Sequence, residues 1–271
     1  MLQFGNSMSL YAALIAVSIR AQMQYRVSFL LMSFGQFIAT GVEAIGLWAL
    51  FARFGQLSDW TLPQVGMFYG VVNIGFALAD ALSKGFDVFG AQYVRTGNFD
   101  RLLLRPRTAV LQLFGHELTL TRVGRIAQAA IVLGWSWHAL QLPVGLTQLL
   151  LLFAALAGCI GLFVGLLILQ ATLAFWTVES LEVMNTVTYG GVETAQYPLS
   201  IYHRYFRRFF TFVVPLGCVA YFPVIALMGA RDPLGSSALL QWLAPLAGVV
   251  FFVVAVLIWR LGVRHYTSTG S

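Results

Sequence analysis

Charged residues are scarce in this chain, and long runs of sequence contain none. Asp, Glu, Lys and Arg make up 10% of the 271 residues, whereas an average soluble domain carries about 25%. The charge-free runs cover residues 60–79, 126–178, 209–230 and 233–259. A helix rises about 1.5 Å per residue and a hydrocarbon core is about 30 Å thick, so roughly 20 apolar residues form one crossing. The sequence therefore predicts a protein that crosses a membrane several times.

The composition favours helical crossings over other membrane architectures. Hydrophobic residues make up 59% of the chain, with 22 Phe and 26 Gly, which is typical of helices that meet lipid on one side and pack through small residues on the other. A transmembrane β-barrel would need short alternating segments instead. Both cysteines, Cys159 and Cys218, lie inside apolar runs, which argues against a disulfide or a cysteine metal site. We expect an all-α integral membrane protein with a single domain over residues 1–271.

The basic residues predict the orientation of the chain. Lys and Arg concentrate on the cytoplasmic side of membrane proteins, and residues 80–125 hold seven of the sixteen basic residues. These are Lys84, Arg95, Arg101, Arg105, Arg107, Arg122 and Arg125. With that segment inside, the loops alternate to give both termini in the cytoplasm and about six crossings. The net charge of +6 is then a feature of topology, and we expect no nucleic acid as a partner.

The stretch before the first predicted crossing, which covers residues 27–50, has two interpretations. Residues 7–24 are moderately apolar and run into Arg20 and Arg26 without a cleavage site of small residues, so they are not a signal peptide. A serine at the start and arginines near the end fit a helix that lies along the cytoplasmic interface. The alternative is an extension of the first crossing.

The fifth crossing also has two candidates within residues 178–229. Hydropathy selects 209–228, which would place the basic cluster at 203–208 inside. Residues 177–196 contain Glu179, Glu182 and Glu193, and each central carboxylate costs about 2.5–3.5 kcal/mol on insertion scales. This argues against a span that faces lipid, although it allows a helix buried among others.

Motifs of known catalytic chemistry are missing from the sequence. The four histidines lie far apart, and none has a carboxylate or histidine partner at the i, i+4 spacing of a metal site. The only lysine, Lys84, stands between Ser83 and Gly85, so there is no phosphate-binding Gly-Lys-Ser/Thr motif. We expect no catalytic residues, no metal and no cofactor in this chain. If ATP drives its work, another subunit must bind the ATP and its Mg²⁺.

The cytoplasmic segment 84–108 is the most distinctive local pattern. Gly97-Asn98 predicts a turn, Asp100 can cap a short helix, and Pro106 ends that helix or begins the next. Arg101 and Arg105 then lie one turn apart on either side of a leucine-rich stretch that starts at Leu102. A basic loop attracted to anionic headgroups explains this composition. Composition alone favours this explanation, although a leucine-rich helix with a fixed turn before it also suits docking onto a protein.

Several segments together resemble one family of membrane proteins. They are the 84–108 segment, the runs at 175–182 (FWTVESLE), 189–191 (YGG), 197–202 (YPLSIY), 213–215 (VVP) and 221–223 (YFP), and the tail at 264–271 (RHYTSTGS). The combination is similar to ATP-binding-cassette (ABC) permeases of the type-2, exporter-like class, in the bacterial subfamily of ABC-2 family transporter proteins. The resemblance covers essentially the whole chain. It implies an inner-membrane permease subunit that pairs with a second copy or a paralogue and with cytoplasmic ATPase subunits.

The resemblance also bears on individual segments. It implies that the helix around Asp100, Arg101, Leu102 and Arg105 is the coupling helix that contacts the ATPase. In the wider class a Tyr-Pro pair and a proline-containing stretch follow the fifth crossing as re-entrant helices on the outer side, and Tyr197-Pro198, Pro215 and Pro223 match that order. On this basis residues 178–196 would be the fifth crossing. The acidic residues of that segment and the basic cluster at 204–208 depart from the class.

Three functions are compatible with these observations. The first is a permease that moves its substrate by alternating access, with Glu43, Asp80, Glu179 and Glu182 as candidates for the translocation path. The second is a lipid-modifying enzyme that uses Glu179, Glu182 and His203, although no spacing predicts that these groups meet. The third is an ion-coupled secondary transporter with Glu43 and Asp80 as proton carriers, but the sequence shows no inverted repeat. We favour the permease. The sequence leaves its substrate open.

Overall fold

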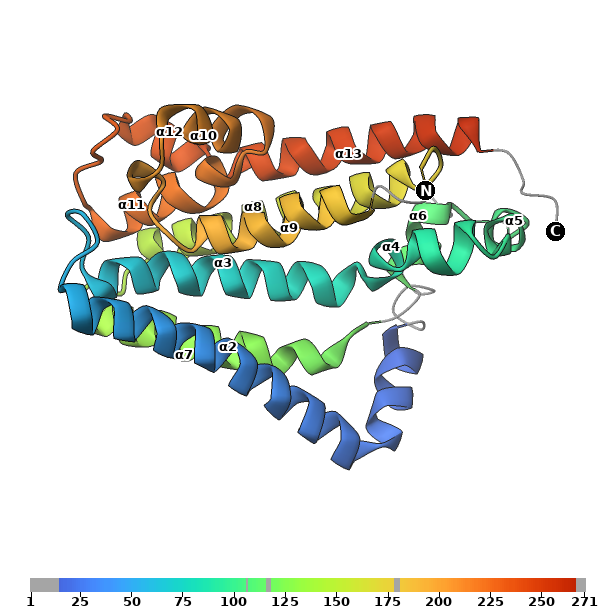
Figure 1. The fold of residues 1–271 in the computed structure, drawn as a ribbon, viewed down its shortest axis with the longest axis horizontal. Helices are drawn as coiled ribbons and strands as arrows, with labels where there is room; N and C mark the ends of the chain where they lie inside the picture. Colours follow the sequence, from blue (N-terminus) through green and yellow to red (C-terminus); the bar gives the residue numbers. More distant parts are fainter. Residues whose placement is uncertain (1–14, 106, 116–117, 178–180, 267–271) are drawn as a thin grey trace.

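The computed structural model describes residues 15–105, 107–115, 118–177 and 181–266, without the side chains of residues 181–183. Helices of the bundle run side by side along its long axis (Figure 1). They are α2 (Arg26–Phe54), α3 (Leu62–Leu82), α7 (Val123–Ala139), α8 (Leu146–Leu173), α9 (Leu181–Ala195) and α13 (Leu246–His265). A turn at residues 140–141 and a non-helical stretch at 142–145 separate α7 from α8.

The two ends of the bundle carry shorter elements. At one end lie α4 (Lys84–Asp87), the π-helix η1 (Gly90–Val94), α5 (Asn98–Leu103) and α6 (Ala109–Phe114), followed by the 3₁₀ turn η2 (Leu120–Arg122). At the other end lie η3 (Leu199–Ile201), α10 (Arg204–Arg208), the π-helices η4 (Phe209–Val213) and η5 (Gly217–Tyr221), α11 (Phe222–Met228) and α12 (Ala238–Leu243). The α4–α6 end also holds the C-terminal end of α13 (Figure 1).

Four helices of the described chain are long and apolar enough to cross a membrane: α2, α3, α8 and α13. The segments 204–213 and 217–228 also pass this test together, although they are bent by 84° at the break between them. The count rises to five if this bent pair is one broken span. In addition, α7 has 17 residues and α9 has 15. The all-α membrane architecture is therefore confirmed, whereas the expected six crossings remain a prediction.

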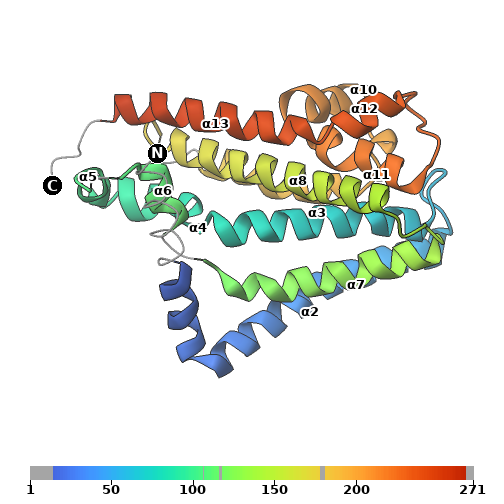
Figure 2. The same ribbon diagram turned by 180° about the vertical axis from the view of Figure 1, so that it is seen from behind.

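Helix α3 is the centre of the bundle. Thr61 and Gln64 form a capping box at its first turn, and a proline lies in that turn, where its missing N–H removes no hydrogen bond. Sixteen of its twenty-one residues are buried. It packs mainly on α7 and α8, while α8 packs most extensively on α13. From behind, α8 lies between α13 and α3, and α7 runs beside α2 (Figure 2).

Glycines bring α8 and α13 into backbone contact. A Cβ added to Gly248 of α13 would lie only 2.0 Å from the carbonyl oxygen of Gly158 on α8. A Cβ on Gly158 would in turn meet the backbone of Pro245 at 2.7 Å. Lipid tails are as apolar as leucine, so helix association in a bilayer depends on close packing of this kind rather than on a hydrophobic driving force.

The N-terminal helix is separate from α2. Residues 15–24 are helical, the chain turns at Tyr25, and α2 then leaves in a different direction (Figure 1). Ser18 accepts a 3.0 Å hydrogen bond from the backbone N–H of Leu118, and Gln22 accepts one of 3.0 Å from Leu120. Gln22 also donates to the carbonyl oxygen of Leu118. Two uncharged side chains thus attach this helix to the segment before α7. Residues 7–14 of the predicted interfacial helix lie outside the described chain.

The end opposite α4–α6 is organised around Asp232, a buried carboxylate in the loop after α11. It accepts hydrogen bonds from the Tyr221 hydroxyl at 2.6 Å and from the backbone N–H groups of Leu234 and Ser236 at 2.9 and 3.0 Å. Burial raises the pKa of this carboxyl, but the hydrogen bonds from Ser236, Tyr221 and Leu234 outweigh burial and hold the pKa below its usual value. Asp232 therefore anchors the bent pair to the loop that leads into α12.

Candidate functional site

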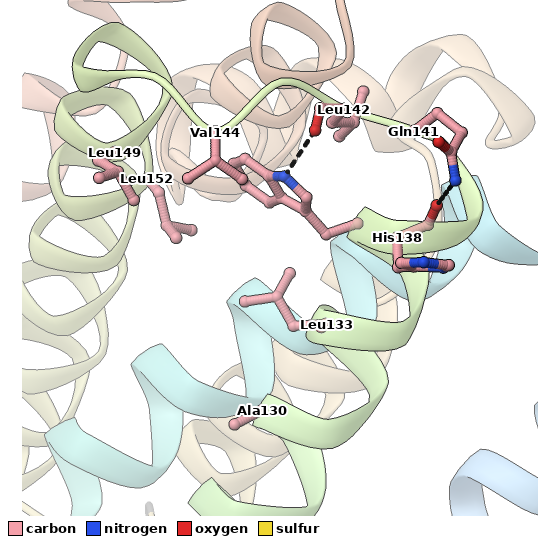
Figure 3. A pocket seen from close by; sticks show the side chains of 10 residues that line it. Ala130, Leu133, His138, Gln141, Leu142, Val144, Leu149 and Leu152 are labelled. Atoms are coloured by element: carbon pink, nitrogen blue, oxygen red, sulfur yellow. Dashed lines mark hydrogen bonds between the residues drawn. The ribbon is translucent and has the colours of Figure 1, made fainter.

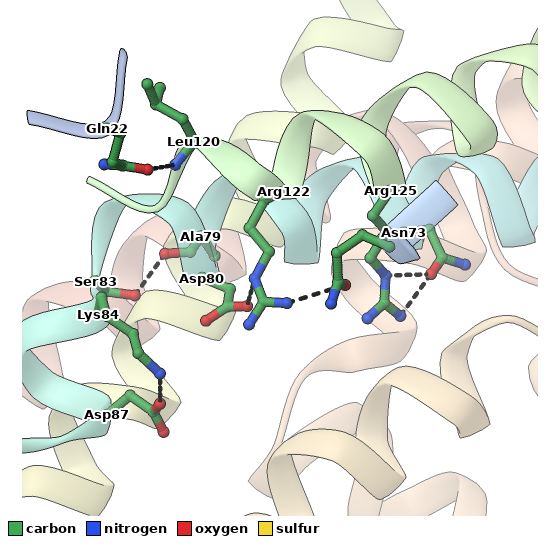
Figure 4. A network of polar contacts seen from close by, with 11 residues as sticks. Gln22, Asn73, Ala79, Asp80, Ser83, Lys84, Asp87, Leu120, Arg122 and Arg125 are labelled. Atoms are coloured by element: carbon green, nitrogen blue, oxygen red, sulfur yellow. Dashed lines mark hydrogen bonds and ion pairs between the residues drawn. The ribbon is translucent and has the colours of Figure 1, made fainter. Parts of the chain in front are cut away.

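A cluster of polar residues lies inside the bundle near the α4–α6 end. Asp80, on the last turns of α3, is 3% exposed, and the Nε of Arg122 lies 2.5 Å from its Oδ2. The same arginine donates through Nη1 to Gln36 on α2 at 3.0 Å. Figure 4 shows Arg122 reaching from the start of α7 to Asp80. This ion pair ties α3, α7 and α2 together.

Arg125 lies one turn further along α7 and has an uncharged partner. Its Nε and Nη2 donate to the same oxygen, Oδ1 of Asn73 on α3, at 2.9 and 2.7 Å (Figure 4). Asn73 in turn donates to the carbonyl oxygen of Tyr69 at 2.9 Å. The guanidinium also lies over the ring of Phe76, 4.9 Å from its centroid, a geometry in which the ring attracts the cation.

Arg125 contacts α3 well inside that helix rather than at its end. Asn73 stands nine residues before the end of α3 at Leu82, which corresponds to about 13 Å of helix. A charge at such a depth in a bilayer is rare and marks a functional site by default. The positive-inside rule does not predict this contact, because it places both Arg122 and Arg125 in the cytoplasmic loop. In the structure the side chains of both arginines reach α3, where Asp80 and Asn73 are their partners.

Glu43 and Glu193 flank this cluster from two other helices. Glu43 is exposed on α2 and Glu193 is exposed on α9, and both are close enough to Arg125 for their charges to interact with it. Since α9 packs beside α3, the three residues share one side of the bundle. Of the predicted path residues, Asp80 is thus paired and buried, while Glu43 is exposed. Glu182 belongs to α9, but its side chain is not described, and Glu179 lies outside the described residues.

The 84–108 segment is a set of short helices on an aromatic base. Gly97 has a φ of +68°, which glycine adopts without strain, and it is the N-cap of α5. The predicted cap was wrong, because Asp100 lies inside the first turn of α5. Phe99 of α5 is fully buried and contacts the rings of Phe89, Phe175 and Trp259. This aromatic cluster joins α5 to the ends of α8 and α13, so a force on α5 reaches two long helices directly.

The residues predicted to contact an ATPase do not all face outward. Leu102 is 5% exposed and packs into the core of the segment, so it supports α5 rather than presenting a surface. Asp100 is half-buried, and the pKa of Tyr266 is raised first by burial and then by its interaction with Asp100. Arg101 and Arg105 are exposed as expected. Pro106 lies outside the described residues.

Two residues that sequence reasoning missed complete the exposed face of α5. Leu103 and Leu104 project outward, and Leu104 is 85% exposed. Next to them a hollow of about 570 Å³ is lined by residues of η1, of α5 and of the chain on either side of α5, among them Tyr93, Asn98, Arg101 and Arg105. An exposed leucine between two arginines, beside a polar hollow, is a surface that suits a protein partner with an apolar contact and an acidic group.

The enzymatic alternative gains no support from the geometry. Within the described part of the chain, no group of three or more His, Cys, Asp or Glu side chains could hold a metal ion. His203 precedes α10 at the end of the bundle opposite α4–α6, where its ring packs against Tyr205 at 5.4 Å. The candidate acid–base residue is therefore far from the polar cluster around Arg125.

Comparison with known proteins gives one match. The sequence matches the family described as ABC-2 family transporter protein over residues 37–270, which is most of the chain. The match includes the whole 84–108 segment and all of the polar cluster except Gln36. Comparisons with curated proteins and with solved structures found no match. The family match, the all-α bundle and its apolar spans all indicate a membrane protein. The chain belongs to the ABC-2 transporter family, whose members are permease components of ABC transporters.

Proposed function

We propose that this chain is the transmembrane subunit of an ATP-driven exporter in the bacterial inner membrane. The observation that carries the proposal is the family match over residues 37–270. The bundle supplies no phosphate-binding motif of its own, so ATP and Mg²⁺ are bound by a cytoplasmic ATPase partner. Transport proceeds by alternating access, in which the ATPase shifts the permease between an inward-open and an outward-open state.

The arrangement of the bundle supports a six-crossing topology. The α4–α6 end holds Lys84, Arg95, Arg101, Arg105 and Arg107, which makes it the cytoplasmic end by the positive-inside rule. In this orientation α9 is the fifth crossing, and the bent pair 204–213 and 217–228 enters from the outer side and returns. The 84° bend and the position of α10 at the opposite end favour this choice over a crossing at 209–228.

The charged side of α2, α3 and α9 is the proposed path. Exposed carboxylates at Glu43 and Glu193 would each cost about 2.5–3.5 kcal/mol against hydrocarbon. The face that carries them must therefore meet water or protein. A second copy of the chain, or a paralogue, placed against this face would enclose a hydrated passage with Arg125 at its wall. Glu179 and Glu182 remain candidates for the same passage because they precede Glu193 in the same segment.

The exposed face of α5 is the proposed contact with the ATPase. Arg101, Leu104 and Arg105 face outward, while Phe99 beneath them contacts Trp259 of α13 and Phe175 after α8. Movement of a docked ATPase would thus be transmitted to α8 and α13. A loop that only senses lipid headgroups would need neither the aromatic base nor the exposed leucine.

The experiment that tests this function measures ATP hydrolysis with and without a partner. The purified chain is assayed alone and after co-expression with an ATPase encoded beside it, in detergent and in liposomes. We expect hydrolysis only in the complex, and none when the phosphate-loop lysine of the ATPase is replaced. Hydrolysis by the isolated chain, or failure of every neighbouring ATPase to co-purify, would contradict the proposal.

A further inference from the structure

A hollow on the far side of the bundle is unrelated to the path or to α5. It has a volume of about 500 Å³ and lies where α7 and α8 diverge, next to the turn that joins them. Its walls are Ala130, Leu133, Gly134, Trp137 and His138 of α7, Gln141, Leu142 and Val144 of the turn, and Leu149 and Leu152 of α8. Figure 3 shows Leu133 and Leu152 facing the same space from the two helices.

The walls of this hollow are apolar along the helices and polar at one end. Leu133, Leu149 and Leu152 line its length, whereas His138 and Gln141 stand at the rim, next to the turn. The indole N–H of Trp137 donates to the carbonyl oxygen of Leu142 at 3.1 Å, so the ring is fixed and turns no polar atom toward the cavity. Gln141 donates to the carbonyl oxygen of His138 at 2.8 Å, which holds the rim in place.

The surroundings of the hollow identify its occupant. Large apolar side chains are exposed on both sides of it, including Ile131 and Trp135 on α7 and Leu150 and Phe153 on α8. Such a surface faces lipid in a membrane-spanning bundle. Lipid molecules of the surrounding membrane can therefore reach the hollow. Its apolar walls match an acyl chain, and its hydrogen-bonding rim matches a phosphate-bearing headgroup.

We propose that this hollow, the α7–α8 groove, is a binding site for one phospholipid of the leaflet on the side of the α7–α8 turn. One acyl chain lies against Leu133, Leu149 and Leu152, and the headgroup phosphate accepts hydrogen bonds from His138 and Gln141. Bulk lipid is as apolar as the groove, so the preference comes from contact on several sides of the chain and from these hydrogen bonds. This proposal requires only that the bundle lies in a membrane, and it does not rest on the proposed transport function.

Gly134 allows the groove to be filled without disturbing the fold. A Cβ at this position meets nothing within 4 Å, and the same is true of Gly41 on α2. Gly134→Leu therefore puts a side chain into the groove, and Gly41→Leu makes the same change on a helix that does not line it. Val144→Trp, at an exposed position on the turn, blocks the groove independently of α7.

The experiment uses dioleoyl phosphatidylethanolamine that carries a photoreactive diazirine in one acyl chain. The full chain is reconstituted with this lipid as a minor component, irradiated, digested and mapped by mass spectrometry. We expect the label to concentrate on the groove-lining peptides of α7 and α8 in the parent protein and in Gly41→Leu. We expect its loss from these peptides in Gly134→Leu and Val144→Trp, with the midpoint of thermal unfolding unchanged.

Two results would overturn the proposal. Labelling spread over α2 and α13 as strongly as over the groove, with no effect of Gly134→Leu, would show ordinary boundary lipid only. Disulfide-linked dimers formed through Gly134→Cys, with no lipid label in the groove, would show that a second copy of the chain covers it. Neither result affects the assignment as a permease, which is tested by ATP hydrolysis with a partner.

Discussion

At the scale of residues, some charged side chains of the bundle are buried with a partner and others are exposed. Asp80 is paired with Arg122, and Arg125 is held by the amide of Asn73. Glu43 and Glu193 are exposed near Arg125. The paired groups fix helices in place, whereas the exposed groups require a hydrated or protein surface. If the proposed path is right, this division separates residues that stabilise the bundle from those that line the path.

The Asp80–Arg122 pair should be needed for stability. Asp80→Asn leaves the arginine without its carboxylate in a poorly hydrated site, and removal of one partner from a buried pair costs about 3–5 kcal/mol. We expect a loss near the lower value, because Arg122 retains Gln36 and is partly exposed. Thermal unfolding of the detergent-solubilised protein measures it. Asp87→Asn is the control, since its pair with Lys84 is partly exposed and worth only about 0–1 kcal/mol.

Asp232 should make stability depend on pH in the acid range. Its folded-state pKa is depressed below the ordinary value of 3.8, so its contribution is fully present above the unfolded-state pKa and is lost as pH falls through the folded-state pKa. We expect the unfolding midpoint to drop as pH is lowered from about 5 to about 3. In Asp232→Asn the midpoint should be lower at neutral pH and its dependence weaker in the acid range. An unchanged acid profile in this variant would contradict the role of the carboxylate.

At the scale of elements, the α8–α13 contact depends on two glycines. Gly248→Ala would place a methyl group in the backbone of α8 at Gly158, and overpacking of this kind costs about 1–3 kcal/mol. We expect a lower unfolding midpoint for this variant. Gly134→Ala is the matched control, because its Cβ meets open space and alanine in a helix is favoured over glycine by about 0.5–1 kcal/mol. Equal midpoints for the two variants would contradict the close contact.

The α5 element should transmit the state of the ATPase through specific side chains. Arg101→Lys and Arg105→Lys keep the charge but lose the planar fork that binds a carboxylate through two hydrogen bonds. We expect both variants to insert normally and to lower permease-coupled ATP hydrolysis. Arg95→Lys, an exposed arginine that precedes α5 and does not line the hollow beside it, is the control and should leave hydrolysis unchanged. If all three variants couple like the parent, the segment is only a topology signal.

At the scale of the whole molecule, the sequence predicted the architecture better than the site. Charge-free runs located α3, α8 and α13 because each is long enough to cross a membrane by itself. The positive-inside rule counts basic residues without considering their partners, so it does not predict that Arg122 and Arg125 contact Asp80 and Asn73 on α3. The outward face of α5 was missed in part. Leu102 and Leu104 look alike in sequence. Leu102 lies three residues after the buried Phe99 and shares its face of α5, so it is buried, whereas Leu104 is 85% exposed.

One part of the architecture could not be predicted from hydropathy. The segments 178–196 and 209–228 compete for the same crossing, and the more apolar of the two is bent by 84° at the break before Gly217. The acidic α9 packs beside α3 and α8, where neighbouring helices cover its polar residues in part. Hydropathy measures a segment against lipid alone, so it cannot decide between a bent apolar pair and a polar helix that packs among others.

The central claim is that the α4–α6 end of the molecule contacts an ATPase through α5. Leu104→Cys places a thiol at an 85% exposed position of this face, whereas the native cysteines are buried or half-buried. Leu146→Cys, exposed at the start of α8 near the other end of the bundle, is the control. A short thiol-to-amine cross-linker is added to the purified complex with the ATPase. We expect a permease–ATPase product with Leu104→Cys and none with Leu146→Cys, and the opposite pattern, or equal yields, would contradict the claim.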